Sequence, residues 1–599
     1  MIHPHPPMGP KSPDSPRRAG DVQARFDPTS RLGRRRGPRS SSFRSRVGAW
    51  ASGGGPLIWL TAGAVSVSLV MVLGLVAVIA VRGLGHFWPA AVVETVYHSQ
   101  AEGEIRVLGA VRRSETVTPV VLREIGYEIP AEMADELFVR HLFQLGNRDL
   151  TGQDFRWFPG PPFTGEWSYP EDVLVLERTE WGNFFGYLRG LQENGHVVAE
   201  GEEAWPVLRD RVARARDLRR QIERIERRGI GSVNIRMERL RLEERAMELQ
   251  GDDDPQVLAE LRARRAALDE EYSVLEAQRL ELQQEIQRDA VVAETMDGRL
   301  VDIPLERVIR ASGPNRMSVT EKGRHYVGKF WEFVSDYPRE ANTEGGILPA
   351  IFGTVIMVLL MSIFVTPVGI LAAIYLREYA KQGRFVQFIR VCVNNLAGVP
   401  SIVFGVFGLG FFIYFVGGGI DRLFYPEALP APTFGTPGLL WASLTLALLT
   451  LPVVIVATEE GLTRIPRSIR EASYAVGSTK AETVWKIVVP MAAPAMMTGL
   501  ILAVARAAGE VAPLMLVGVV KLAPNLPVDG IAPFLHLERK FMHLGFHIYD
   551  VGFQSPNVEA ARPLVYATAL TLVIIIIALN LTAIAIRQRL REKYRSESD

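Results

Sequence analysis

The chain has 599 residues, of which 48% are hydrophobic and 22% are charged. This composition is too apolar for an average soluble protein and too charged for a chain that lies wholly in lipid, so it indicates a membrane protein with sizeable soluble parts. The net charge of +1 gives no overall attraction to nucleic acid, and the single cysteine excludes a disulfide within the chain.

The first 55 residues form a basic arm that is rich in Pro, Ser and Arg. Eleven basic residues and three acidic ones precede Leu57. Because this composition cannot bury a core, we expect residues 1–55 to be disordered. An uncharged run over 57–81 follows, and it predicts a first transmembrane helix over 56–82. No clear cleavage site follows the run, which indicates a retained signal anchor.

Residues 83–345 separate this helix from the remaining apolar segments, and we expect them to form a soluble insert. Its first part, 91–201, mixes short β-type runs with Pro and Gly breaks, as in "VVLREIGYEI" and "DVLVLERTEW". This alternation predicts a small α+β domain.

The second part of the insert, 205–288, is rich in Glu, Arg, Leu and Gln. An apolar stripe runs through its first half, and leucines recur every seven residues in its second half, at Leu261, Leu268, Leu275 and Leu282. The turn sequence "GDDDP" separates the halves, so we predict an antiparallel coiled-coil hairpin roughly 50 Å long. Arg265 and Arg279 fall on the expected seam. A solvated spacer and a docking arm are equally good interpretations of this hairpin.

Two local patterns resemble ligand sites without completing them. The sequence "GRHYVGK" over 323–329 has the spacing of a phosphate-binding loop, but Phe330 stands where a Mg²⁺-binding hydroxyl is needed and no apolar strand precedes it. His543 and His547 have the helical spacing of a metal site, but Gly545 lies between them and no thiolate is near. We therefore expect no nucleotide site, no metal site, and ordinary histidines of an outer loop.

Five further segments are apolar and long enough to cross a membrane, over 347–376, 391–420, 428–458, 490–520 and 563–586. Lys and Arg concentrate in the arm, in the loops 377–390 and 459–486, and in the tail, whereas the opposite loops are poorer in them. The positive-inside rule therefore places both termini in the cytoplasm and the insert outside it. We expect a membrane core over 346–587 and a cytoplasmic tail over 588–599.

A charged segment over 466–489 interrupts the apolar core. Pro466 suits a first helical position, and Ile469, Ala472 and Val476 then share one apolar face, with Arg467, Arg470 and Glu471 pointing elsewhere. Gly477 is expected to end this helix.

A second short helix follows this glycine. Thr479 and Glu482 have the spacing of a capping box, which predicts a helix start that carries Val484, Trp485 and Val488 toward the next span. The two short helices would form a rigid amphipathic unit at the cytoplasmic ends of two spans, available to a partner protein.

The sequence from 471 to 490, "EASYAVGSTKAETVWKIVVP", resembles the Glu-Ala-Ala, three residues, Gly, nine residues, Ile, Pro pattern of ABC importer permeases. The matching residues are Glu471, Ala472, Gly477, Ile487 and Pro490, with Ser473 in place of the second alanine. In that family this segment is the coupling helix, which inserts into a cleft on the ATPase subunit. The resemblance therefore implies that these six positions serve ATPase coupling.

Four stretches around this segment, over 345–380, 396–408, 451–466 and 499–515, resemble the PstA-type permease of phosphate importers. The resemblance extends over about 345–587 and the first span, roughly half of the chain. It implies a mostly α, six-span MetI-like fold of the type I ABC importers, with the insert as an addition.

The same resemblance implies a transporter subunit without enzymatic activity or cofactor, in the inner membrane of a bacterial cell. It would form half of the translocation pathway for inorganic phosphate. Its implied partners are cytoplasmic ATP-binding subunits, a second permease subunit, an extracytoplasmic phosphate-binding protein and membrane lipid.

Arg506 and Glu510 interrupt the apolar segment 490–520, where each charge costs roughly 3 kcal/mol near a bilayer centre. Their four-residue spacing places both on one helix face, and Pro513 is expected to loosen the helix beyond them. The resemblance associates such a pair with the translocation pathway. The alternative is a pair that only neutralises itself between helices.

Two other functions remain open from the sequence. A permease for another oxyanion, such as molybdate or sulfate, would have the same fold. A non-transporting membrane scaffold would use the coiled coil to recruit an envelope partner.

Overall fold

The computed structural model describes residues 55–99, 103–124, 136–159, 166–251, 254–555 and 558–596. The basic arm expected over 1–55 lies outside these residues apart from Gly55, and so does part of the "GDDDP" turn. The chain divides into a unit over residues 1–73 and a compact unit over 74–599. Helix α2 (Gly55–Gly85) begins in the first unit and ends in the second.

Six helical segments in the described part of the chain are long and apolar enough to cross a membrane, as predicted. A helix satisfies its own backbone hydrogen bonds, which lipid cannot do, so these segments make the chain a multi-pass membrane protein. They contain α2, α9 (Leu348–Ile374), α11 (Ser401–Phe407) with α12 (Gly418–Phe424), α13 (Leu439–Thr463), α16 (Val489–Gly509) and α19 (Val558–Ser596).

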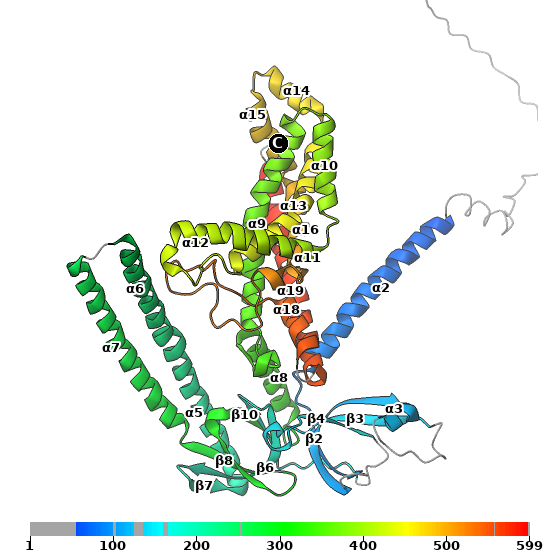
Figure 1. Ribbon diagram of the computed structural model, residues 1–599. Coiled ribbons are helices and arrows are strands. Elements are labelled where there is room, and N and C mark those ends of the chain that lie inside the picture. Colours follow the sequence, from blue (N-terminus) through cyan, green and yellow to red (C-terminus); the bar gives the residue numbers. More distant parts are fainter. Residues whose placement is uncertain are drawn as a thin grey trace, which may run out of the picture. The chain divides into compact units, whose positions relative to one another are not determined.

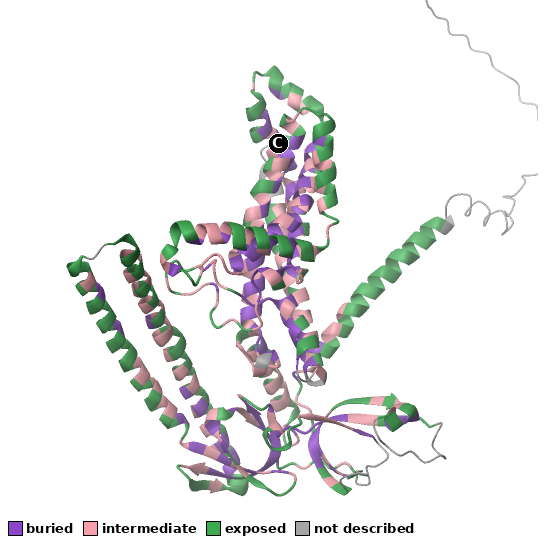
Figure 2. Cartoon of the chain, viewed as in Figure 1, coloured by how far each residue is buried: buried purple, intermediate pink, exposed green. Residues whose placement is uncertain are grey.

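Helices α9, α13 and α16 pack together around the main apolar core of the membrane region. Figure 2 shows the buried residues of these helices in purple. Small residues let the backbones approach closely: a Cβ atom added at Gly499 on α16 would lie 2.6 Å from the Cβ of Ala457 on α13. Such contacts stabilise helix pairs in lipid, where the hydrophobic effect does not drive helices together.

Three expected spans have different boundaries in the structure. The segment expected over 391–420 consists of two helices, because α10 (Arg384–Leu396) ends before Pro400 and the spanning helix begins at Ser401. The segment expected over 428–458 becomes helical only at Leu439. The segment expected over 490–520 leaves the helix after Gly509, and α17 (Leu514–Val517) is a separate short turn.

The insert contains two larger antiparallel sheets. The first has the order β1-β2-β3-β4, and the second has the order β10-β5-β6-β8-β9 with β7 also paired to β6. The strands are β1 (Val92–Ser99), β2 (Gly103–Val117), β3 (Phe138–Gln144), β4 (Phe155–Pro159), β5 (Val173–Arg178), β6 (Asn183–Glu193), β7 (His196–Glu200), β8 (Asp289–Glu294), β9 (Leu300–Pro304) and β10 (Val308–Ser312).

Of the two runs expected to be strands, one is confirmed and one is not. The run "DVLVLERTEW" contains β5, whose six residues are all buried. The described start of "VVLREIGYEI" is instead helical, in α3 (Pro119–Glu124), and its remainder lies outside the described residues. Strands β8 to β10 follow the predicted hairpin in sequence and complete the second sheet, which the sequence analysis did not foresee.

The helical hairpin is an insertion between β7 and β8. Helix α5 (Ala204–Arg224), the π-helical turn η3 (Ile225–Ile230) and α6 (Gly231–Gln250) form one arm, and α7 (Pro255–Ile286) returns beside it (Figure 1). Gly251 has a φ of 70° at the end of α6, and the side chain of Asp254 caps α7, so the predicted turn separates the two arms. Coiled-coil packing of the two arms stays a prediction.

The two arginines expected on the hairpin seam differ in position. Arg279 reaches across to Glu226 on the other arm at 3.8 Å and is 25% exposed, whereas Arg265 lies 4.0 Å from Glu244 of the other arm but is 62% exposed. Farther along α6, Arg239 donates a hydrogen bond to the carbonyl oxygen of Ala532 in a loop of the membrane core. The hairpin is therefore in contact with the core as well as with its own sheet.

A helix and a short sheet connect the insert to the membrane core. The sequence "GRHYVGK" lies wholly inside α8 (Val319–Ser335), so it forms no phosphate-binding loop. Ser318 and Glu321 form a capping box at the start of this helix. The strands β11 (Pro338–Arg339) and β12 (Glu344–Gly345) then pair and lead into α9.

Candidate functional site

The charged segment between α13 and α16 folds into two short helices joined at Gly477. Helix α14 (Arg467–Ala475) follows Pro466, which is its N-cap rather than its first residue. Gly477 has a φ of 88°, a conformation that residues with a Cβ rarely adopt. The N–H of Ser478 donates to the carbonyl of Ser473 at 3.2 Å, and the N–H of Gly477 donates to that of Tyr474 at 3.0 Å. This hydrogen-bond pattern is a Schellman motif, so Gly477 ends the helix as predicted.

The second short helix begins with the predicted capping box. The Thr479 hydroxyl accepts from the N–H of Glu482, whose carboxylate in turn accepts from the N–H of Thr479. Helix α15 (Lys480–Thr483) then continues through the π-helical turn η9 (Val484–Val488) into α16. The turn at Gly477 is therefore rigidly connected to a membrane helix.

Arg470 anchors α14 to the membrane helices, a role that the sequence analysis missed. Its guanidinium donates to the Glu378 carboxylate at 2.7 Å and to the carbonyl oxygens of Ile465 and Leu462 at 2.8 and 3.0 Å. Glu378 lies in η6 (Tyr375–Tyr379), the continuation of α9, and Leu462 lies in the last turn of α13. The side chains of Arg470 and Glu378 are only 16% and 9% exposed. One residue thus ties α14 to the ends of two membrane helices.

Ser473 adds a second attachment. Its buried hydroxyl lies 2.8 Å from the hydroxyl of Thr483, so a hydrogen bond joins α14 to α15 across the Gly477 turn. An alanine, which the family pattern has at this position, could not make this bond. Compared with the family pattern, Ser473 therefore makes a polar contact at a buried position where alanine would make an apolar one.

The apolar face predicted for α14 is only partly buried. Ile469 is half-buried, but Ala472 is exposed and Val476 is 82% exposed. Trp485 is also 51% exposed, whereas Val484 and Val488 beside it are buried. The correction has a simple cause, because Arg470 and Ser473 occupy the side of α14 that faces the bundle. We call the exposed group the coupling surface; it consists of Glu471, Ala472, Tyr474, Val476, Gly477 and Trp485.

The predicted coupling residues therefore fall into two classes. Glu471, Ala472 and Gly477 are exposed on the coupling surface, while Ser473 is buried behind it. Ile487 and Pro490 are half-buried where η9 enters α16. Exposed apolar side chains beside exposed charges are typical of protein interaction sites. The residues of the coupling surface are open to solvent, while Arg470 and Ser473 behind it bond to neighbouring helices.

The second predicted pair lies at the far end of α16. Arg506 is in the last turn of this helix, and its Nε donates to Oε1 of Glu510 at 3.3 Å. Glu510 itself has an extended backbone, so the charged pair marks the point where the helix stops. Arg506 follows Pro490 by sixteen residues, roughly 24 Å along the helix axis. The structure therefore does not bring the pair together with the coupling surface.

His543 and His547, expected in an outer loop, are buried at the short helix α18 (Leu544–Tyr549) between α17 and α19. His543 caps α18, where its Nδ1 accepts from the N–H of Gly545 at 3.1 Å, and His547 is buried in the same helix. Burial lowers the pKa of each to about 4, so both are neutral near pH 7. The described residues contain no group of three or more side chains arranged to hold a metal ion.

Comparison with known proteins identifies the membrane core. Residues 365–596 match the family described as "Binding-protein-dependent transport system inner membrane component". The "Phosphate transport system permease protein PstA 1" of Mycobacterium tuberculosis is 34% identical over 244 residues, which cover 41% of this chain and 71% of that protein. A "Probable phosphate transport system permease protein PstA" of Methanocaldococcus jannaschii is 30% identical over 239 residues, 39% of this chain and 73% of that protein.

One solved structure, of the MetNI methionine ABC transporter in inward-facing conformations, aligns with a TM-score of 0.31 and 18% identity over 41% of this chain and 95% of that chain. The sequence identity to the mycobacterial protein, over most of that protein's length, decides the assignment. The chain belongs to the PstA-type permeases of ABC importers, and it is accordingly a transporter subunit and not an enzyme.

Proposed function

We propose that this chain is the permease subunit of an ATP-driven importer of inorganic phosphate and that it forms half of the translocation pathway. The proposal is supported by relatives that are named as phosphate transport system permeases. Its second support is mechanical and comes from the anchored coupling surface.

The Arg470 anchor is the observation that carries the mechanism. A separate cytoplasmic ATPase would grip the coupling surface, and its ATP-driven movement would displace α14. Because Arg470 bonds to groups at the ends of both α9 and α13, displacement of α14 would pull on both membrane helices. The continuous path from α15 through η9 would load α16 at the same time.

Arg506 and Glu510 would line the pathway. Arg506 is about one third exposed in the last turn of an apolar spanning segment, and Glu510, one residue beyond the end of that segment, is less exposed. A guanidinium fork matches the oxygen atoms of phosphate in geometry and charge. Movement of α16 would shift Arg506 between the two sides of the membrane, with Glu510 competing for it when no anion is bound.

The complete transporter would contain two cytoplasmic ATP-binding subunits, a second permease subunit and an extracytoplasmic phosphate-binding protein. Both termini and the coupling surface would face the cytoplasm of a bacterial cell, and the insert would lie outside the inner membrane. The excess of Lys and Arg in the coupling segment and the tail supports this orientation.

Uptake of radiolabelled phosphate into cells that depend on this transporter tests the proposal. We expect excess unlabelled phosphate to compete and molybdate or sulfate not to compete. Arg506→Ala should abolish uptake while the subunits still copurify. Normal uptake by Arg506→Ala, together with loss of an envelope partner after deletion of residues 205–288, would instead identify a scaffold.

The orientation has its own test. Cys392 is the single cysteine, so Cys392→Ser provides a background for a cysteine introduced at Val476. A membrane-impermeant thiol reagent should label this position only in inside-out vesicles. Labelling in intact spheroplasts would overturn the orientation and the coupling mechanism with it.

A further inference from the structure

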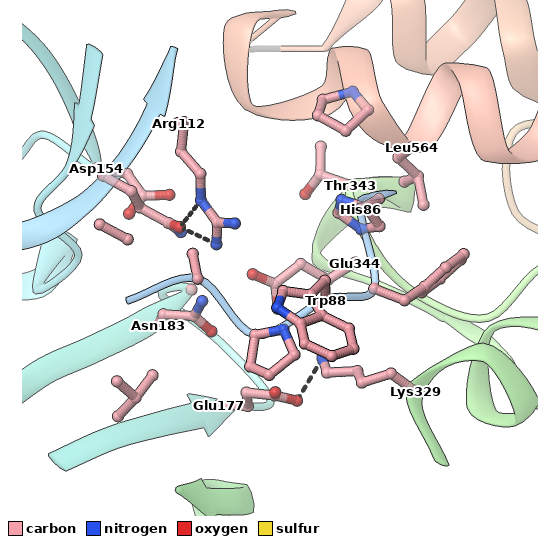
Figure 3. A pocket seen from close by; sticks show the side chains of 18 of the residues that line it. His86, Trp88, Arg112, Asp154, Glu177, Asn183, Lys329, Thr343, Glu344 and Leu564 are labelled. Carbon is pink, nitrogen blue, oxygen red and sulfur yellow. Dashed lines mark hydrogen bonds and ion pairs between the residues drawn. The ribbon is translucent and has the colours of Figure 1, made fainter. Parts of the chain in front are cut away.

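The insert contains a cavity of about 550 Å³ that no part of the proposed transport mechanism uses. Its lining comes from both larger sheets, from β11 and β12, from α8, from the end of α2 and the segment after it, and from the beginning of α19 (Figure 3). The volume lies in the range typical of small-molecule sites. Most of the side chains that face it are polar or charged, so the cavity is suited to a charged ligand.

The cavity is lined by five described cations of the Lys and Arg type and by five carboxylates. Three of each are matched in close ion pairs, one of which is drawn in Figure 3. The pairs are Arg148–Glu340 at 3.1 Å, Lys329–Glu177 at 2.6 Å and Arg339–Glu332 at 2.6 Å. Two guanidinium groups and two carboxyl groups are left without an ion pair among the described residues.

The two remaining cations are Arg112 and Arg82. Arg112 reaches into the cavity from β2, and its Nε and Nη2 both donate to Oε1 of Gln144, at 2.9 and 2.7 Å. Arg82 donates to the hydroxyl of Tyr566 at 3.1 Å. Both hydrogen-bond partners are neutral, so neither guanidinium is in an ion pair among the described residues. Both side chains are exposed, Arg112 to the space of the cavity, so each guanidinium can still take an anion as its partner.

The two remaining acids are Asp154 and Glu344. Gln144 also forms a hydrogen bond to Asp154, which places this carboxyl behind the amide that holds Arg112. Burial raises the pKa of Asp154 to about 6 and that of Glu344 to about 7. Near pH 7 Glu344 is therefore partly uncharged, whereas Asp154 is mostly ionised, and both guanidinium groups stay charged. The unpaired groups of the cavity thus carry a net positive charge.

Two histidines of the lining do not change this balance. Burial lowers the pKa of His86 to about 3 and lowers the pKa of His325 as well, so both imidazoles are neutral at pH 7. They leave the two guanidinium groups as the uncompensated charges of the cavity. The cavity therefore favours an anion.

We propose that this cavity binds a phosphate group, as orthophosphate or as a phosphate monoester, with Arg112 as its principal ligand and Arg82 as a second. A guanidinium fork pairs with two oxygens of such a group. A phosphate that keeps one proton also donates a hydrogen bond, and the carboxyl of Glu344 faces the same space to accept it. A phosphodiester has no such proton, so a lipid headgroup fits the cavity less completely. The choice of orthophosphate as first probe rests on the proposed transport function.

Binding of radiolabelled orthophosphate to the purified full-length chain, measured by equilibrium dialysis, tests the site. We expect Arg112→Gln to weaken binding at least tenfold and Arg112→Lys to weaken it less. Arg189→Gln is the matched control, because Arg189 is an exposed arginine of the second sheet that pairs with Glu294 and does not line the cavity. It should bind as the unchanged protein does.

Several outcomes would overturn the inference. They are equal binding by Arg112→Gln and the unchanged chain, no binding of either orthophosphate or glycerol phosphate, and loss of binding only in Arg506→Gln. A second experiment uses nanodiscs that contain phosphatidylglycerol and no added phosphate. If this lipid stays bound to the unchanged chain but is lost from Arg112→Gln, the anion site is supported and the role of Glu344 is overturned. Thermal unfolding of each variant separates misfolding from lost binding.

Transport measurements distinguish this inference from the proposed function. Suppose that Arg112→Gln loses orthophosphate binding while the unchanged transporter takes up other anions and no phosphate. This result would refute phosphate transport but leave the cavity site intact. Phosphate uptake that stops in Arg506→Ala, with dialysis binding unchanged, would separate the two sites.

Discussion

Removal of the Arg470 guanidinium, as in Arg470→Gln, should release the coupling surface from the membrane helices. The substitution breaks the ion pair with Glu378 and the hydrogen bonds to two carbonyl oxygens. Breaking a buried pair at one partner costs roughly 3 to 5 kcal/mol, because the other charge is left buried and unpaired. Arg470 is slightly exposed, so we expect the lower end, about 3 kcal/mol, or a change of roughly a hundredfold in the local opening equilibrium.

Hydrogen exchange followed by mass spectrometry measures this opening. Amides over 467–483 should exchange roughly a hundredfold faster in Arg470→Gln, while those of the buried parts of α9 and α13 stay protected. The ATPase subunit should copurify poorly with the variant. Phosphate uptake should fall in parallel, since the coupling surface would no longer move the membrane helices.

Arg464→Gln provides a matched control in the same region. Arg464 pairs with Glu460 at 3.8 Å, but both side chains are largely exposed, so removal of this pair should cost less than about 1 kcal/mol. The double variant Arg470→Gln with Glu378→Gln removes both buried charges and should recover part of the lost protection. Equal exchange rates in Arg470→Gln and Arg464→Gln would refute the anchoring role.

Three further predictions concern other parts of the chain. Gly477→Ala should destabilise the coupling turn by roughly 1 to 2 kcal/mol and weaken ATPase copurification, because the φ of 88° strains a residue with a Cβ although the space around it is open. Binding of sulfate, whose charge is constant over this range, should be tighter at pH 6 than at pH 8, because Glu344 takes up its proton as the pH falls through about 7. The free energy of unfolding should fall as the pH drops from about 6.5 to about 4. The reason is that His543 and His547 take up protons at a higher pH in the unfolded chain than in the folded one. Each histidine contributes at most about 3 kcal/mol to this loss.

Each of these has a discriminating comparison. Asparagine tolerates a positive φ better than alanine, so Gly477→Asn should reduce ATPase copurification less than Gly477→Ala. An equal reduction in both variants would show that any side chain at this position interferes, whatever its φ preference. Glu344→Gln should flatten the pH dependence of sulfate binding, leaving the part due to Asp154. His547→Leu should reduce the loss of stability at pH 5, whereas His196→Gln, at an exposed strand position, should leave it unchanged.

Local sequence signals accounted for much of the membrane core and of the coupling segment. Six spans follow from runs of apolar residues, because a helix that crosses lipid needs about 20 predominantly apolar residues. The capping box at Thr479 and the turn at Gly477 follow from residues next to them in the chain, so the sequence alone was sufficient for both.

Tertiary structure decided which surfaces of these elements are covered. Helical periodicity grouped Ala472 with Val476 on one face, but only the packing of α14 against α9 and α13 shows that Arg470 is turned inward and Val476 outward. The second sheet pairs β6 with β8 across the whole helical hairpin, a contact between residues about a hundred positions apart that no local pattern encodes. The cavity likewise exists only because strands, α8 and the ends of α2 and α19 meet, since whether a charge is paired depends on neighbours in space and not in sequence.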